Sequence, residues 1–299
     1  MTTAALETRG LGRRFGSTWA LEDCTLELPR HRVTALVGPN GAGKTTLLHI
    51  AVGLTAPSAG TVLVFGRSPQ AEAADVLPRI GFVAQDHPLL RGFSIRDLMK
   101  TGAELNPRWD EPLARNRLER FGLDPRRKAA SLSVGEQAQV ALSLALAKRP
   151  EFLLLDEPVA SLDPLARRDF LQLVLEAVAE DGLTVLLSSH IVAELERVSD
   201  FLVILARSKV RLSGDIDEVL ARHRILTGPR CDPRSVARIH DVVHESHAER
   251  QTTLLVRANG HLYDSAWEVH EATFEEIVLA YLGLGAHAPT PAAQLEEAS

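Results

Sequence analysis

Cysteine is scarce in this chain. Cys24 and Cys231 are its two cysteines among 299 residues, and they stand far apart with no paired spacing. This pattern excludes a disulfide framework and is expected of a reduced protein in the cytosol.

Long apolar runs and an excess of basic residues are also lacking. No apolar stretch approaches the roughly 20 residues that cross a bilayer, and the N-terminus shows no signal-peptide pattern. We therefore expect a soluble chain, for which any membrane role requires a partner that supplies the spanning helices. The net charge of -6 and the isoelectric point near 6.0 argue against a general nucleic-acid binder.

The hydrophobic pattern predicts an α/β core. Short strands rich in Val, Leu and Thr are predicted at 6–15, 22–28, 32–37 and 61–65. Apolar runs at 80–84, 152–155, 184–187 and 201–205 follow, and their separation by helices is typical of a parallel sheet covered on both faces. Residues 86–150 are predicted to form a mostly helical insertion, with breaks at Pro107, Pro112 and Pro125.

The residues beyond about 215 have a different pattern. Strand-like pieces at 242–247 and 251–256 surround a turn, and an amphipathic helix is predicted at 273–282. We expect a main domain over 1–215 with its helical part at about 86–150, a small α+β region over 216–285, and a disordered tail over 286–299.

The most specific motif fits the phosphate-binding pattern G-x-x-x-x-G-K-[ST] and joins a predicted strand to a predicted helix at 46–51. Its residues are Gly38, Pro39, Asn40, Gly41, Ala42, Gly43, Lys44, Thr45 and Thr46. The glycines let backbone N–H groups converge on phosphate oxygens, and the helix dipole adds to their attraction. Lys44 can then reach the β- and γ-phosphates, while the Thr45 hydroxyl can bind Mg²⁺. The alternative is a glycine-rich turn with a surface lysine.

Two acids, Asp156 and Glu157, end the apolar run at 152–155. Ligands of nucleotide-binding α/β folds lie at the carboxyl ends of strands, so both acids would lie near bound phosphates. Asp156 suits Mg²⁺ held through water, and Glu157 suits polarising an attacking water. Taken alone, the pair could equally cap a strand; beside a phosphate loop, the chemical role is favoured.

Three further side chains are candidates on weaker grounds. Gln85 ends a predicted strand and could contact Mg²⁺ or the attacking water. His190 follows the strand at 184–187 and could hydrogen-bond a γ-phosphate oxygen. Taken alone, each of these two is better interpreted as an ordinary loop residue. Phe15 could stack on an adenine ring as readily as fill a core position.

Ser133 and Glu136 have the S-x-x-E spacing of a capping box at the start of a long predicted helix. That role explains both residues structurally. A helix N-terminus that carries Ser133 and Gly135 is also a ready anion site, and the two interpretations are compatible. The preceding run Arg126-Arg127-Lys128 is interpreted as a solvated loop without a function.

Taken in order, these motifs resemble those of the ATP-binding subunit of ABC transporters. The resemblance covers residues 5–220. It assigns the phosphate loop to Gly38–Thr46, the Q-loop to Gln85, the signature to Leu132–Glu136, the second acidic motif to Asp156 and Glu157, the D-loop to Ser161–Asp163, the switch histidine to His190 and the adenine-stacking aromatic to Phe15.

The resemblance implies a P-loop NTPase core with a mostly parallel sheet, an N-terminal antiparallel β subdomain, the helical insertion and a small C-terminal α+β appendage. It implies ATP and Mg²⁺ as ligands, with the metal held by Thr45, Gln85 and Asp156, and hydrolysis assisted by Glu157, His190 and Gln85. In a head-to-tail dimer with a second, identical or paralogous ATP-binding subunit, the nucleotide would also contact Ser133, Gly135, Glu136 and Asp163. Membrane-spanning subunits would contact a surface near Asp86–Asp97, so the chain would lie on the inner face of the cell membrane.

One departure from the family concerns the signature, usually Leu-Ser-Gly-Gly-Gln. Here Val134 replaces the first glycine, which removes backbone freedom, and Glu136 replaces the glutamine. Glu136 would put a negative charge near the γ-phosphate, unless it turns back to its own backbone as the capping box suggests. We expect a working but slower site.

The stretch 272–282 is similar to the ending of bacterial drug-exporter-type ATP-binding subunits, which favours export over import. An alternative function is that of a soluble ABC-type ATPase acting on nucleic acid or ribosomes. The chain has neither a second nucleotide domain nor a long coiled-coil insertion, which argues against it. Retention of Glu157 argues against a regulatory protein that binds ATP without turnover.

Overall fold

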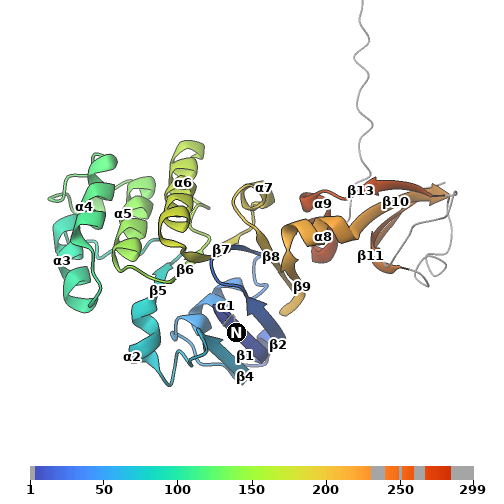
Figure 1. Ribbon diagram of the computed structural model, residues 1–299, viewed down its shortest axis with the longest axis horizontal. Helices are drawn as coiled ribbons and strands as arrows, with labels where there is room; N and C mark the ends of the chain where they lie inside the picture. The colour runs from blue at the N-terminus through green and yellow to red at the C-terminus, as the bar shows by residue number, and fades with distance from the viewer. Residues whose placement is uncertain (1–3, 230–239, 249–250, 259–266, 284–299) are drawn as a thin grey trace, which may run out of the picture. The chain divides into compact units, whose positions relative to one another are not determined.

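The structure is a computed structural model that describes residues 4–229, 240–248, 251–258 and 267–283. The chain divides between Ile216 and Asp217 into two units, each described by itself below (Figure 1). The tail expected over 286–299 and Cys231 lie outside the described residues. Cys24 is a buried free cysteine.

A six-stranded sheet forms the centre of the first unit. Its order is β5 (Ile80–Val83), β6 (Phe152–Asp156), β7 (Thr184–Ser189), β3 (Val33–Val37), β8 (Phe201–Ala206) and β9 (Lys209–Asp215). The strands are parallel except β9, which pairs antiparallel with β8. Every residue of β3, β6 and β7 is buried, and this explains their continuous apolar sequences. The predicted, mostly parallel sheet is confirmed.

The N-terminal part of this unit forms an antiparallel sheet of three strands. Its order is β2 (Thr18–Leu28), β1 (Leu6–Phe15) and β4 (Ala59–Val64). Leu6 and Val64 from this sheet share one apolar cluster with Leu47 of α1 (Lys44–Ala51) and Phe152 of the central sheet. Helix α1 is therefore held by both sheets, which fixes the position of its N-terminus.

The predicted helical insertion consists of α3 (Ile95–Leu105), α4 (Glu111–Arg120) and α5 (Val134–Ala147), which lie side by side (Figure 1). They share an apolar cluster of their own that includes Leu98, Leu118 and Val140. Pro112 was predicted to mark a break in the helical stretch. It stands in the first turn of α4, where its missing N–H leaves no helical hydrogen bond unmade, so it interrupts no helix. The other helical segments of this unit are α2 (Ala73–Val76), α6 (Pro164–Asp181), α7 (Val192–Glu196) and the 3-10 turns Leu77–Arg79 and Ala129–Ser131.

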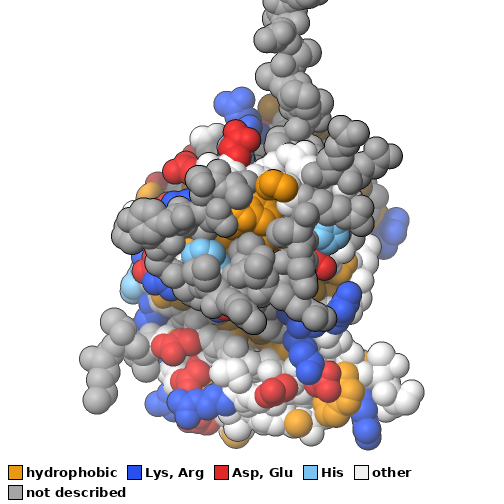
Figure 2. Space-filling model, turned by 90° about the vertical axis from the view of Figure 1, so that its right-hand side faces the viewer, with side chains coloured by type: hydrophobic (Ala, Val, Ile, Leu, Met, Phe, Trp, Pro, Cys, Tyr) orange, Lys and Arg blue, Asp and Glu red, His pale blue; other side chains and the backbone are white. Residues whose placement is uncertain are grey.

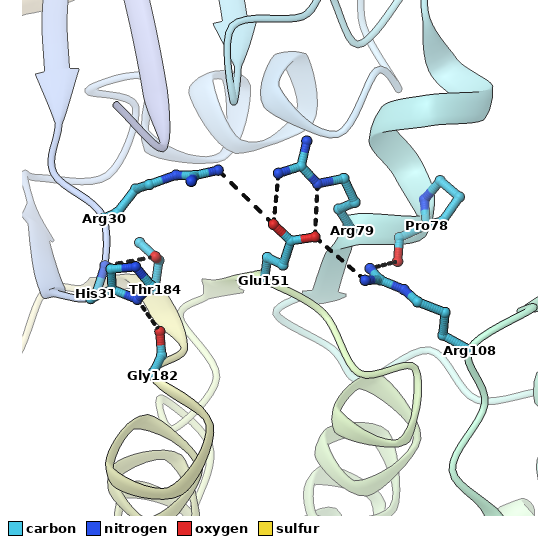
Figure 3. A network of polar contacts seen from close by, with 8 residues as sticks. All are labelled: Arg30, His31, Pro78, Arg79, Arg108, Glu151, Gly182 and Thr184. Carbon is cyan, nitrogen blue, oxygen red and sulfur yellow. Dashed lines mark hydrogen bonds and ion pairs between the residues drawn. The ribbon is translucent and has the colours of Figure 1, made fainter. Parts of the chain in front are cut away.

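Glu151 joins the helical insertion to the central sheet at the amino ends of β5 and β6 (Figure 3). Its carboxylate accepts two hydrogen bonds from Arg79, at 2.8 and 2.6 Å. Arg108 lies in the loop between α3 and α4. It contacts the same carboxylate at 3.4 Å and donates to the Pro78 carbonyl at 3.2 Å. Nη2 of Arg30 lies 4.0 Å from Oε2 of Glu151. The Arg79 guanidinium, with a smaller contribution from Arg108, holds the pKa of Glu151 below its usual range.

The second unit contains a four-stranded antiparallel sheet. Its order is β11 (Asp241–His247), β12 (Gln251–Arg257), β10 (His223–Pro229) and β13 (Glu268–Glu271), with α8 (Ile216–Arg222) before the sheet and α9 (Phe274–Leu282) after it. β11, β12 and α9 confirm the strands and the helix predicted for this part, whereas β10, β13 and α8 were not predicted. Helix α9 begins at a capping box formed by Thr273 and Glu276 and ends at Gly283, whose φ is 74°.

Candidate functional site

The phosphate loop joins β3 to α1 at the carboxyl end of the central sheet. A Cβ at Gly38 would lie 2.4 Å from the Leu205 carbonyl oxygen, so a larger residue does not fit there. Gly43 is the N-cap of α1 and has a φ of 106°, a left-handed conformation that favours glycine. Helix α1 begins at Lys44, two residues earlier than predicted, and has no acid in its first turn. Its N-terminus therefore offers N–H groups and partial positive charge to an anion.

Lys44 turns its ammonium group back toward the loop. Nζ donates to the carbonyl oxygens of Gly38 at 2.7 Å and Pro39 at 3.3 Å, and it lies 3.0 Å from Oε1 of Glu157. The Lys44 side chain is only 5% exposed. The alternative of a glycine-rich turn with a surface lysine is therefore excluded, because this ammonium group is buried among polar partners.

Glu157 lies between Lys44 and His190. Its Oε1 faces Lys44, and its Oε2 lies 2.8 Å from Nδ1 of His190. Burial alone would raise the pKa of Glu157, but the contacts with Lys44 and His190 outweigh burial and hold the pKa below its usual range. The carboxylate is ionised at neutral pH and can accept a hydrogen bond from a water molecule.

The backbone of Glu157 has an uncommon conformation. Its φ is 44°, in the left-handed region, which costs a residue other than glycine about 1–3 kcal/mol. Ser188 supports this conformation, because its Oγ accepts the Glu157 N–H at 2.9 Å and donates to Oδ1 of Asp156 at 2.8 Å. Asp156 and Ser188 are partners in the β6–β7 register. The end of the sheet thus holds both predicted acids in place.

An open cavity of about 530 Å³ brings most of the predicted site residues together, and small-molecule sites are of this size. Its lining includes Phe15, Asn40, Gly41, Gly43, Lys44, Thr45, Thr46, Gln85, Glu157 and His190. Phe15 is 53% exposed, so it is a surface available for stacking and not a core residue. Gly38, Pro39 and Ala42 belong to the loop but not to the lining, and Asp156 stands outside the lining as well.

Oxygen atoms suited to Mg²⁺ are present in the lining. The Thr45 hydroxyl and the Gln85 amide oxygen are hard donors of the kind Mg²⁺ prefers. Asp156 stands outside the lining, so it fits contact through water better than direct contact. Over the described ranges no cluster of three or more His, Cys, Asp or Glu side chains could hold a metal. The donors present fit a cation that shares its shell with water and phosphate oxygens.

Known proteins with a similar sequence decide the family. Residues 21–160 match the family model described as ABC transporter. The chain is 38% identical over 248 residues to the nickel import ATP-binding protein NikO of Rhodobacter capsulatus, an overlap of 77% of this chain and 97% of that protein. The chain belongs to the ABC transporter family.

Other members are similar over most of their length. The aliphatic sulfonates import ATP-binding protein SsuB of Shigella flexneri is 34% identical over 252 residues, which cover 84% of this chain and 94% of SsuB. The lantibiotic transport ATP-binding protein SrtF of Streptococcus pyogenes is 30% identical over 217 residues, 71% of this chain and 91% of SrtF. The solved structure of cbiO1 from Clostridium perfringens, part of the complex cbiONQ, has a TM-score of 0.63 at 28% identity and covers 73% of this chain and 91% of cbiO1. These members confirm the P-loop fold and the ATPase activity expected from the sequence.

The ABC signature lies outside the cavity lining. Ser133 is the N-cap of α5: its Oγ accepts the Glu136 N–H at 3.2 Å, and Oε2 of Glu136 accepts the Ser133 N–H at 2.7 Å. Of the two alternatives for Glu136, the structure shows the side chain turned back to its own backbone. A Cβ at Gly135 would lie 3.2 Å from Cβ of Ala166, so glycine allows α5 and α6 to approach closely.

Arg127 neutralises Glu136. Its Nη1 and Nη2 contact the two carboxylate oxygens at 2.5 and 2.9 Å. The Arg127 guanidinium holds the pKa of Glu136 below its usual range. Arg127 lies in the predicted loop and is partly solvated, but its side chain also has a partner, because the loop folds back onto the N-terminus of α5. The departure of Glu136 from the ABC signature thus comes with a compensating cation.

The D-loop residue Asp163 is the N-cap of α6. Its Oδ1 accepts the N–H groups of Leu165 and Ala166, both at 3.0 Å. Val134 and Leu165, at the starts of α5 and α6, are 48% and 67% exposed. The lining that contains Lys44 does not include Ser133, Gly135, Glu136 or Asp163.

His87 was not singled out from the sequence. It follows Gln85 by two residues, is 2% exposed, and its Nε2 lies 2.9 Å from the carbonyl oxygen of Pro158, the residue after Glu157. Burial lowers the pKa of His87. Its position in a polar loop gave no signal that the ring is buried.

Proposed function

We propose that this chain is the ATP-hydrolysing subunit of a transporter whose membrane-spanning part is formed by separate subunits. The arrangement that carries this proposal is Glu157, held between Lys44 and His190 in a cavity that also contains the phosphate loop. A carboxylate, a buried ammonium and converging N–H groups are what phosphate binding and attack by water require.

Each group has a defined part in this proposal. The phosphates of ATP bind the N-terminus of α1 and Lys44, while the adenine stacks on Phe15. Without ATP, the Lys44 ammonium contacts the Glu157 carboxylate. The bound γ-phosphate would compete with Glu157 for this ammonium, and the released carboxylate would then polarise the attacking water. His190 contacts the same carboxylate, which supports a hydrogen bond from its ring to the γ-phosphate. Mg²⁺ would be held by Thr45, Gln85 and, through water, Asp156, and its charge would offset that of the phosphates.

A second ATP-binding subunit, identical or paralogous, completes the site. Ser133, Gly135 and Asp163 lie outside the cavity that contains Lys44, although the family resemblance expects them at the nucleotide. The exposed side chains of Val134 and Leu165 beside them suit a contact between subunits. Head-to-tail pairing would bring one subunit's signature to the other's phosphate loop, and ATP would shift the population toward the paired state.

Membrane-spanning partners would dock near Asp86–Asp97. Leu90 and Phe93 are 55% and 39% exposed in the segment between Gln85 and α3, which supports a docking surface there. None of the helices in the described part of the chain has the length and apolar character needed to cross a membrane. The proposal therefore places the chain at the inner face of the cell membrane, bound to these partners.

The direction of transport departs from the expectation of export. NikO and SsuB are named for import, whereas SrtF is named for lantibiotic transport without a direction. These names support import, and we propose import in place of export. They also speak against the alternative of an ATPase acting on nucleic acid. On the face that Figure 2 shows, acidic and basic side chains of the described residues are interspersed, which is unlike a basic nucleic-acid surface.

Purification of the tagged chain from detergent-solubilised native membranes tests the proposal. A membrane protein with several spanning helices should co-purify in fixed stoichiometry, and a Leu90→Glu variant should lose it. Leu54→Glu is the matched control, because Leu54 is 66% exposed and lies outside the proposed docking surface. Recovery from the soluble fraction alone, or with ribosomes or DNA, would reject the transporter function.

A further inference from the structure

His87 is a buried histidine in an exposed segment. Asp86 and Pro88, on either side of it, are exposed, whereas His87 itself is 2% exposed. Its φ of 44° marks a sharp turn of the chain at this point. A polar ring that is buried in a folded protein requires a hydrogen-bond partner.

The partner of the ring is the segment that carries Glu157. Nε2 of His87 lies 2.9 Å from the carbonyl oxygen of Pro158, 71 positions along the chain. A carbonyl oxygen only accepts, so Nε2 carries a hydrogen and donates it. Because Pro158 has no N–H, its carbonyl oxygen is the backbone atom through which a hydrogen bond can hold this residue.

Hydrogen bonds on both sides enclose the peptide units around Glu157, whose N–H also contacts the Ser188 carbonyl oxygen at 3.2 Å and whose carbonyl accepts the Ala160 N–H at 3.2 Å. On one side the Glu157 N–H donates to Ser188 Oγ at 2.9 Å, and on the other His87 holds the carbonyl of Pro158. Between them Glu157 keeps its φ of 44°, a conformation that persists only where the surroundings impose it. The direction in which the Glu157 carboxylate points depends on this backbone conformation.

We propose that His87 is a positioning residue for ATP hydrolysis, which keeps the Glu157 carboxylate in place by hydrogen-bonding the carbonyl of Pro158. The same bond links the segment from Gln85 to α3 with the segment that follows β6. His87 does not line the cavity and acts through the backbone alone. This inference rests on the function proposed above.

A pair of matched variants tests it. Glutamine at position 87 offers an amide N–H at about the reach of Nε2, and methionine has a similar unbranched shape without a donor. We would measure kcat and KM for Mg-ATP, with thermal unfolding midpoints, on the purified full chain. His87→Gln should keep kcat within about twofold of wild type, and His87→Met should lose about tenfold or more. KM should stay within about twofold in both, because the displaced group acts on the transition state.

A purely structural role of His87 predicts a different result. Equal losses of kcat in the two variants, or no loss in either, would overturn the proposal. If His87→Met fails to fold, His87→Phe, which keeps a ring without the donor, takes its place with the same expected loss. Wild-type turnover separates the two claims. If wild type hydrolyses ATP and the pair behaves alike, the role of His87 alone is refuted; if folded wild type, purified together with its partner subunits, does not hydrolyse ATP, both claims are refuted.

Discussion

Replacing Glu136 tests whether its carboxylate serves the start of α5 and not the nucleotide. Glu136 accepts the Ser133 N–H at 2.7 Å and contacts Arg127 at 2.5 and 2.9 Å. Glu136→Ala removes all of these contacts. Glu136→Gln keeps an acceptor for the capping box but removes the charge that Arg127 neutralises.

The structure gives the expected sizes of the two effects. A helix cap contributes about 1 kcal/mol to stability. The side chains of Arg127 and Glu136 are 36% and 31% exposed, so water screens their ion pair and it contributes less than the cap. Glu136→Ala should therefore lower the free energy of unfolding by about 1 kcal/mol or more, and Glu136→Gln by clearly less than Glu136→Ala.

The effect of Glu136 should depend on pH in a defined direction. Its folded-state pKa lies below its ordinary value of 4.5, because Arg127 and the Ser133 backbone stabilise the ionised form. The unfolded chain then binds the proton first as pH falls. The stability difference between wild type and Glu136→Gln should be constant near neutral pH and should shrink as pH falls below about 4.5.

Urea unfolding followed by circular dichroism, at pH 7 and at about pH 4, measures these differences. Because Arg127 neutralises the carboxylate, ATP turnover by Glu136→Gln should stay within about twofold of wild type. Unchanged stability together with a several-fold rise in turnover would show that the charge of Glu136 acts on the phosphates, and would refute the reasoning.

Two further predictions concern Ser188 and Phe15. Ser188→Ala removes the buried partner of Asp156 Oδ1 and leaves the Glu157 N–H only the longer bond to the Ser188 carbonyl, so it should cost about 2 kcal/mol of stability and about tenfold in kcat. Ser189→Ala is its control, and equal losses of ATPase rate in the two variants would contradict the role of Ser188. Phe15→Ala should weaken ATP binding by about 1 kcal/mol, roughly fivefold in Kd, whereas Phe15→Tyr should leave it unchanged. Titration calorimetry with a non-hydrolysable ATP analogue measures this, and unaltered affinity for Phe15→Ala would argue against stacking.

The buried strands and the phosphate loop were predictable because each depends on adjacent residues. The apolar run of β6 is fully buried, and the glycine spacing of the loop matches its need for positive φ at Gly43. The strands β9 and β13 escaped prediction because they lie at sheet edges, where partly or fully exposed polar residues interrupt the apolar pattern.

The contacts of Arg127 and His87 could not be predicted because they join distant segments. Arg127 belongs to a charged run that is typical of a solvated loop, and only the fold of that loop brings it to Glu136. His87 meets Pro158 across 71 positions of the chain. By contrast, Gln85 and His190 line the same cavity as Glu157, because all three follow strands of one parallel sheet.

The most direct test of the central claim compares wild type with Glu157→Gln. ATP hydrolysis is measured at steady state, and the association state is followed by size-exclusion chromatography with ATP present. If Glu157 polarises the attacking water, the variant should lose at least about a hundredfold in kcat, still bind ATP, and accumulate as an ATP-bound dimer. Equal hydrolysis by wild type and Glu157→Gln would contradict the assignment of Glu157 and the account built on it.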